Sequence, residues 1–239
     1  MPMLDIQNVL WEILSYGNFM NYNDFEKNLD LVSKHYYENQ SLTLKKIENL
    51  FKEYLKEHPN DSEVSIRYAI FLLEDLHDDY GALEPLKKII DNDPNNVEAV
   101  LIMGYIIWGF MGYMYEDYTF QRLNELKTDD PELLSMIEYV KYLYYSMNNN
   151  LLHQECLKKS VEFYDKHVKN NYRLGLNYGK ETEIGKIFIK KAINNVQSIY
   201  IYLFPSFTIR TKEDFLNEFV KGTHITNSIY EMMKESLDS

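Results

Sequence analysis

Apolar residues recur at intervals of three and four along most of the chain, the spacing that places side chains on one face of an α-helix. At the start this pattern predicts a helix from Leu4 to Met20. Asn23-Asp-Phe-Glu26 has the form of a capping box and predicts a second helix that runs to about Glu38. Ser41 is expected to cap a third helix, which ends before Pro59.

A recurring proline divides the next part of the chain. His58-Pro-Asn-Asp61 returns as Asp93-Pro-Asn-Asn96, and a looser copy is Asp129-Asp-Pro-Glu132. The three prolines are 35 and 37 residues apart. After each proline the pattern indicates an apolar helix, a polar turn and an amphipathic helix, which together predict helix–turn–helix repeat units. The units are expected at Ser62–Asp91, Val97–Lys127 and Glu132–Lys169, with turns at His77–Gly81, Tyr115–Tyr118 and Asn148–Asn150.

The spacing and several residues of these units resemble the tetratricopeptide repeat, a helix–turn–helix unit of about 34 residues. Tyr68-Ala69 and Met103-Gly104 occupy its large–small pair in the first and second units, and Ala82 occupies the small site after the first turn. Small residues at these sites let the two helices of a unit approach closely. The third unit departs from the pattern because Glu138 replaces the small residue.

The resemblance implies an all-α fold, a right-handed α-solenoid of helix–turn–helix repeats with extra capping helices at both ends. The likeness covers residues 60–165 and includes 23–59 as a degenerate leading unit. We expect one helical-repeat domain over residues 1–239. Its parts are N-terminal helices at 1–59, repeats at 60–169 and C-terminal capping helices at 170–239.

The C-terminal part follows a different pattern. Residues 170–179 are rich in Asn, Gly and Tyr and predict a loop. Thr182 is expected to cap a helix that runs toward Leu203, although the β-branched and aromatic residues of 199–204 also fit an extended segment. The remaining predicted elements are a capping-box helix from Thr211 to Val220, a stop at Gly222 and a last helix from about Thr226.

Composition agrees with helices and narrows the partners. The 239 residues include only 9 Gly and 6 Pro, too few for the many turns of a β-sandwich or barrel. The net charge of −12 disfavours nucleic acid, because phosphate contacts need Lys and Arg. That charge is uneven: residues 1–131 carry −13, whereas residues 158–191 carry +5. The exclusion of nucleic acid is therefore weaker for the C-terminal part.

One stretch bears on the compartment. Residues 99–115 form an uncharged run of 17, at the lower edge of what spans a bilayer. Acidic residues flank it on both sides, so we interpret it as a buried helix and a turn, and we expect no membrane association. The first residues carry an acid where a signal peptide has bases, and Cys156 is the single cysteine. These features favour the cytoplasm.

Candidate chemistry is sparse. The chain has no nucleotide-binding glycine pattern, no His-Glu-x-x-His and no nucleophile elbow. Asp91-x-Asp93-x-Asn95 begins like a calcium loop but lacks its glycine and its final glutamate. Glu74-Asp75-x-His77-Asp78-Asp79 has metal-ligand residue types but also suits a solvated turn, and Cys156 near His153 suits plain packing. We therefore predict a non-enzymatic protein with no catalytic residue, no metal site and no cofactor.

The resemblance also implies a binding surface, because in tetratricopeptide folds the first helix of each unit lines the concave face. Rigid aromatics with a polar tip favour protein binding there. The alternative is that N- or C-terminal helices fold back and cover the same residues. The implied positions are Glu63, Ile66, Ile70 and Leu73 in the first unit, Glu98, Leu101, Tyr105 and Trp108 in the second, and Glu132, Tyr139 and Tyr142 in the third.

Charge suggests the kind of partner. Residues 57–98 carry 11 acids and three bases, and an acidic face beside aromatics suits a basic protein, although a merely solvated surface is the more ordinary explanation. We hypothesise a bacterial immunity protein that neutralises a basic toxin. The alternatives are a scaffold or regulatory adaptor that docks a peptide in the groove, and a hydrolase or metal enzyme built on the acidic cluster near His77. The candidate partner-binding residues are Glu63, Ile66, Ile70, Glu74, Asp75, Asp78, Asp79, Tyr105, Trp108, Tyr139 and Tyr142.

Overall fold

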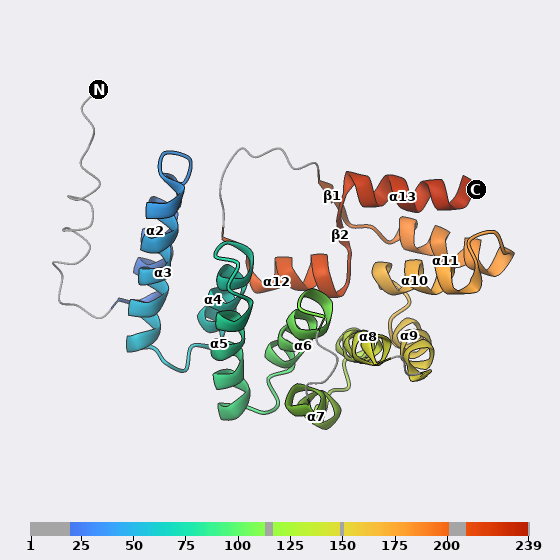
Figure 1. Cartoon of the computed structure of the whole chain (residues 1–239), viewed down its shortest axis with the longest axis horizontal. Coiled ribbons are helices and arrows are strands. Elements are labelled where there is room, and N and C mark those ends of the chain that lie inside the picture. Colours follow the sequence, from blue (N-terminus) through green and yellow to red (C-terminus); the bar gives the residue numbers. More distant parts are fainter. Residues whose placement is uncertain (1–19, 113–116, 149–150, 201–208, 239) are drawn as a thin grey trace.

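The protein is an α-solenoid in which helix pairs follow one another from one end of the molecule to the other (Figure 1). The computed structural model describes residues 20–112, 117–148, 151–200 and 209–238. The paired helices are α2 (Tyr22–Ser33) with α3 (Gln40–Glu57), α4 (Ser62–Glu74) with α5 (Asp79–Asn92), α6 (Val97–Tyr105) and its π-helical extension η1 (Ile106–Phe110) with α7 (Asp117–Glu125), α8 (Pro131–Met147) with α9 (Leu152–Phe163), and α10 (Val168–Tyr178) with α11 (Glu183–Asn194).

The three predicted repeat units are present, and side-chain caps explain where each begins. The Asp61 carboxylate accepts a hydrogen bond from the backbone N–H of Val64 (3.1 Å). Asn96 caps α6 in the same way, through Ala99 N–H (3.1 Å), and Asp130 caps α8. Each cap satisfies a backbone donor that a helix start leaves open. Pro-x-Asp/Asn therefore marks the start of the first two units, and Asp-Pro marks the start of the third.

The starts of the second and third predicted helices are shifted by two residues. Asn21, not Asn23, caps α2 by accepting from Asp24 N–H (3.0 Å), and Asn39, not Ser41, caps α3. Asparagine is as good a cap as serine, so the sequence offered two candidates at each place. The predicted helix from Leu4 lies outside the described residues up to position 19, and so do residues 115 and 116 of the second predicted turn.

The predicted loop at 170–179 is wrong, because these residues form most of α10, the first helix of a further pair. Asn170 and Asn171 are fully buried. Asn170 donates to the Ser160 hydroxyl, and Asn171 donates to the carbonyl oxygens of Asp165 (2.8 Å) and His167 (2.7 Å). Buried amides with partners stabilise the helix that loop-favouring residue types disfavour.

Gly175 is the second reason for this error. A Cβ at this position would lie 2.6 Å from Ile189 Cγ1 of α11 and 2.9 Å from the Gly185 carbonyl oxygen. The glycine therefore permits close approach of α10 and α11 and does not mark a turn.

The C-terminal part of the chain leaves the array and returns to it. Thr182 caps α11 as predicted, but the helix ends at Asn194 and is followed by β1 (Ser198–Tyr200). β1 pairs in parallel with β2 (His224–Thr226), in the register Ser198 to His224. Between them lie α12 (Lys212–Phe215) and the π-helical turn η2 (Leu216–Val220), and after β2 comes α13 (Asn227–Asp238), which packs on α11. We call residues 209–222 the strap.

The strap has the ends that its sequence predicts. Thr211 forms the capping box: its hydroxyl accepts from Asp214 N–H (3.1 Å), and the Asp214 carboxylate accepts from Thr211 N–H (3.4 Å). At the other end, Gly222 has φ +66°, a conformation that suits glycine, and it ends the turn. Figure 1 shows α12 lying between α4 and the β1–β2 pair, above α6. The strap therefore crosses the repeats and does not extend them.

The long uncharged run supplies the centre of the core. Ala99, Val100, Leu101 and Ile102 are completely buried, in one cluster with residues of α4, α5, α8 and the strap. From Ala99 onward helix α6 is apolar on all sides, as expected of a helix that other elements surround. None of the helices in the described residues has both the length and the apolar character that crossing a membrane requires.

Candidate protein-binding groove

The first helices of successive pairs form one face of the array, and the strap lies against it. Ile66 and Ile70 of α4, both predicted for the groove, are only 1% exposed. They belong to the same apolar cluster as Phe215 and Val220 of the strap, which are themselves fully buried. In this structure the predicted groove is therefore covered by residues from the C-terminal part of the chain, which was the alternative to an open groove.

Aromatic rings form the middle of the contact. The ring of Tyr105 in α6 lies 6.1 Å from that of Phe215 and 5.9 Å from that of Phe219. Phe110 lies on the same side, with ring centroids 6.3 Å from Phe215 and 5.1 Å from Phe219. These separations are typical of favourable tilted and offset aromatic pairs. We call Tyr105 of α6 and Phe110 of η1 the aromatic seat. The two strap phenylalanines pack against it.

Phe110 takes the position that we predicted for Trp108. In an α-helix the residues three and four positions after Tyr105 would share its face. Residues 106–110 instead form a π-helical turn, in which Met111 N–H donates to the Ile106 carbonyl oxygen five residues back (2.9 Å). The wider turn brings the fifth residue back to the face of Tyr105.

Trp108 is consequently turned away from the strap. Its ring lies 5.2 Å from that of Tyr144 in α8 and 6.2 Å from that of Phe120 in α7, and it is completely buried. Trp108 is therefore a core residue between helices, and its predicted place in the groove is corrected.

A row of glutamates forms the acidic edge of the groove. Glu63, Glu98 and Glu132 are each the second residue of the first helix of a unit, namely α4, α6 and α8. Lys212 of the strap lies between two of them, with Nζ 2.8 Å from a Glu63 oxygen and 2.6 Å from a Glu98 oxygen. Lys221 pairs with Glu132. An acid in the first turn also favours the helix dipole, and here the same acids hold basic side chains.

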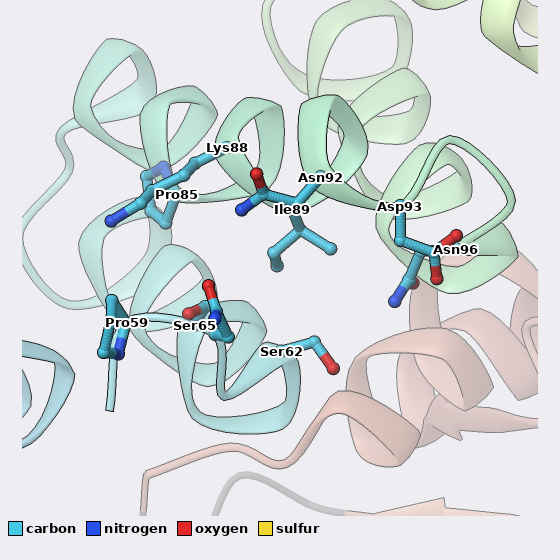
Figure 2. A pocket seen from close by; sticks show the side chains of 10 residues that line it. Pro59, Ser62, Ser65, Pro85, Lys88, Ile89, Asn92, Asp93 and Asn96 are labelled. Carbon is cyan, nitrogen blue, oxygen red and sulfur yellow. The ribbon is translucent and has the colours of Figure 1, made fainter.

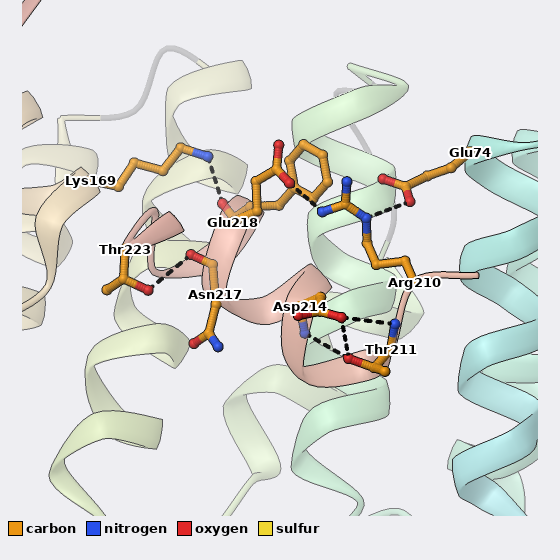
Figure 3. Close-up of polar contacts among 9 residues, drawn as sticks. Glu74, Lys169, Arg210, Thr211, Asp214, Asn217, Glu218 and Thr223 are labelled. Atoms are coloured by element: carbon orange, nitrogen blue, oxygen red, sulfur yellow. Dashed lines mark hydrogen bonds and ion pairs between the residues drawn. The ribbon is translucent and has the colours of Figure 1, made fainter. Parts of the chain in front are cut away.

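Arg210 fixes the N-terminal end of the strap (Figure 3). Its Nε is 2.8 Å from a Glu74 oxygen, it also pairs with Glu218, and it lies over the Phe219 ring at 5.3 Å. Burial raises the pKa of Glu74 to about 7, although Arg210 lowers it. Burial likewise raises the pKa of Asp75 to about 6. These two predicted partner-binding carboxylates are thus largely covered within the chain.

Lys169 of α10 holds the C-terminal end of the strap. Its ammonium donates to the carbonyl oxygen of Phe219 (2.6 Å) and to the hydroxyl of Tyr105 (2.8 Å). It also lies over the Tyr105 ring at 5.0 Å. Burial, together with nearby Arg173, lowers the pKa of Lys169 to about 7. A buried lysine is costly unless its donors find partners, and two of its three donors do so here.

Tyr139 and Tyr142 of α8 extend the aromatic surface of the groove toward the next helix pair, α10 with α11. Their rings stack with centroids 5.9 Å apart, and Tyr139 is completely buried. Arg173 of α10 donates to the Tyr142 hydroxyl (3.2 Å) and lies over both rings. Their predicted role in binding a partner is not tested by these contacts.

The acidic turn between α4 and α5 has an architectural explanation. Asp78 caps α5 by accepting from Gly81 N–H (2.8 Å), and His77 adopts a positive φ of 53° in the turn. Asp78 and Asp79 are exposed. Among the described residues no three His, Cys, Asp or Glu side chains come together as a metal site would require. The metal-enzyme alternative at Glu74, His77 and Asp79 gains no support from this arrangement.

Two further places were candidates for chemistry, the Cys156 thiol and a pocket, and neither has the features of a reactive site. Burial raises the pKa of the Cys156 thiol to about 12, with further contributions from Glu138, so the nucleophilic thiolate is scarce at neutral pH. A pocket of about 230 Å³ lies between α4 and α5 (Figure 2). Two of its polar residues already serve the helix ends: the Ser65 hydroxyl donates to the Asp61 carbonyl oxygen (2.7 Å), and Asn96 caps α6.

Local sequence signals did not predict the side of the groove that the strap forms. Its basic residues Arg210, Lys212 and Lys221 lie more than 80 residues beyond the glutamates of α4, α6 and α8 with which they pair, and its phenylalanines Phe215 and Phe219 lie equally far from that part of the chain. The signals were a capping box, phenylalanines four residues apart, and basic residues on both sides of them. These signals predict an amphipathic helix but not where it docks.

Comparison with known proteins supports the fold. No family model matches the sequence. Among solved structures, the chain is similar to the MamA RS-1 ArsTM double mutant, with 20% identity and a TM-score of 0.51 over 74% of this chain and 96% of that one. It is also similar to MamA 41-end from Desulfovibrio magneticus RS-1, with 17% identity and a TM-score of 0.51 over the same shares. MamA is a tetratricopeptide-like helical repeat protein, so the likeness shows a tetratricopeptide-like fold.

Proposed function

We propose that this protein is a non-enzymatic scaffold or adaptor that binds a segment of another protein in its concave groove. One observation carries the proposal: the groove already holds a peptide segment, by ion pairs at equivalent positions of three units and by an aromatic seat. A surface that recognises a segment of its own chain in this way has the chemistry for a partner's segment.

The test is affinity capture with matched variants of the whole chain. Phe215→Ala/Phe219→Ala weakens the strap and leaves the groove intact, whereas Glu63→Lys/Glu98→Lys on that background reverses the groove. Glu181→Lys/Glu183→Lys gives the same change in charge on exposed residues at the start of α11. We expect the Phe215→Ala/Phe219→Ala variant, called the opened chain below, to capture a partner protein. The added Glu63→Lys/Glu98→Lys change should abolish this capture, and the control change should not. Binding is then measured with the purified partner. Capture that ignores the groove reversal would contradict the proposal.

Toxin neutralisation is a finer hypothesis, and so is a cytoplasmic location. The likeness to MamA concerns the fold and says nothing of either. The acidic surface left for a basic toxin centres on exposed Asp78 and Asp79, because Glu74 and Asp75 lie largely covered. If the protein neutralises a toxin, reversing these two exposed charges should abolish protection of cells that express that toxin.

A further inference from the structure

We propose that the strap stands in for an external partner, and that the groove binds in its place an amphipathic helical segment with two phenylalanines four residues apart and basic residues on both sides. This inference rests on the proposed function, because it names the partner of the same groove. It further implies that the chain regulates access to its own binding site.

The strands on either side of the strap are paired with each other and packed by α13. The strap lies between β1 and β2 in the sequence. These two strands pair side by side, from Ser198–His224 to Tyr200–Thr226. Helix α13 packs on α11 and on this strand pair. Both ends of the excursion are therefore held at one place, and removal of the strap breaks none of these contacts.

The strap has little structure that would persist outside the groove. Helix α12 has four residues and η2 has five. Even joined end to end they are shorter than the ~12–15 residues at which an isolated helix becomes marginally stable, and π-helical turns are rare. Its conformation therefore depends on the groove, as expected of a bound peptide.

The contacts define what a competing segment must carry. Lys212 comes three residues before Phe215, and Lys221 comes two residues after Phe219. The ion pairs of Lys212 lie at the rim, where Glu63 is 42% and Glu98 is 39% exposed, so an external basic side chain can reach these acids. The acids favour basic segments and reject acidic ones.

The strap also leaves part of the groove unfilled. A cavity of about 380 Å³ remains between the strap and the starts of α6 and α8. Its lining is mostly charged, and Leu133, Met136 and Leu216 add an apolar part; the charged residues are Glu98, Asp130, Glu132, Lys212, Glu213 and Lys221. A partner segment with a longer side chain at this point, apolar along its stem and polar at its tip, buries more surface than the strap does, which gives it an advantage in the exchange.

A peptide competition experiment tests the inference. The probe is a fluorescent peptide with the sequence of residues 209–222, and its control carries Lys212→Glu and Lys221→Glu. Each is titrated against the wild-type chain, the opened chain (Phe215→Ala/Phe219→Ala), and the opened chain with Glu98→Lys/Glu132→Lys. Because the strap occupies the competent site in the wild type, we expect the opened chain to bind the probe at least ~10-fold more tightly. The control peptide should lose binding and regain it with the reversed groove.

Equal affinity of the probe for the wild-type and opened chains, or no binding to an opened chain that keeps its helical circular dichroism, would overturn the inference. If the opened chain does not fold, hydrogen exchange of the wild type decides. Strap amides that exchange before those of α4 and α8 support release, and amides that exchange only together with them refute it. Groove-dependent capture of a partner that lacks this pattern would leave the proposed function standing and the inference rejected.

Discussion

Phe215 is the residue through which the seating of the strap can be measured most directly. It is completely buried and lies against the rings of Tyr105, Phe110 and Phe219. Its replacement by alanine removes these contacts and leaves a cavity, a change that typically costs about 3–5 kcal/mol in a protein core. For a chain of this size such a loss lowers the unfolding temperature by about 6–20 °C.

The assay is urea and thermal unfolding followed by far-UV circular dichroism. The matched control is Phe163→Ala, because Phe163 at the end of α9 is 43% exposed and should lose about 1 kcal/mol or less. The strap can also respond to Phe215→Ala by leaving the groove, which limits the loss to the free energy that held it there. Hydrogen exchange separates the two responses, since a released strap loses amide protection while α8 keeps it.

One result would refute the reasoning. If Phe215→Ala costs no more than Phe163→Ala, and the strap amides remain as protected as in the wild type, Phe215 does not fill the groove in solution. The aromatic seat on Tyr105 and Phe110 would then have no energetic role.

Three further predictions concern charge. Lys212→Glu places a third carboxylate beside Glu63 and Glu98, and at these partly exposed sites it should lower the free energy of unfolding by about 1–2 kcal/mol, with part restored by Glu98→Lys in the same chain; denaturant titration measures both. In the wild type, stability should rise as pH rises from about 7 toward 10.5, because the unfolded chain keeps the Lys169 proton that the folded chain has released; Lys169→Met should remove this rise in unfolding measured across that range. The contribution of Glu74 to stability changes with pH in the opposite direction. Because the folded chain binds the Glu74 proton more tightly than the unfolded chain, this contribution is fully present below pH 4.5 and is lost as pH rises to about 7. Glu74→Gln should flatten that loss, and an unchanged slope would show that Glu74 is not buried.

Local signals predicted the repeat units well because each unit is built from contacts close in sequence. The prolines at 59, 94 and 131 and the capping residues beside them mark the turns without reference to the rest of the chain. The same local reasoning failed at α10. Asn170, Asn171 and Gly175 favour loops by propensity. That preference is reversed only by contacts within the fold: Asn170 donates to Ser160 of α9, Asn171 donates to carbonyl oxygens of the turn before α10, and Gly175 lies close to α11.

The groove was predictable in its floor but not in its occupant. Glu63, Ile66 and Tyr105 follow from the helical register of each unit. Trp108 does not, because the π-helical turn after Tyr105 changes the register by one residue, and the spacing of apolar residues does not distinguish such a turn from an α-helix. The docking of Lys212 onto Glu98 joins residues 114 apart, a pairing that depends on the completed solenoid.

The strap follows the helices of the groove in the sequence, so the groove is synthesised before the segment that fills it. The ribosome delivers α4, α6 and α8 before residue 169 and the strap only about 50 residues later, a delay of about 2–10 s at about 5–20 residues per second. During that interval the aromatic seat is complete and empty. A partner present at the site of translation meets a vacant groove, whereas one that arrives later must compete with a segment tethered to it. Assembly on the nascent chain and assembly on the finished protein are therefore different reactions.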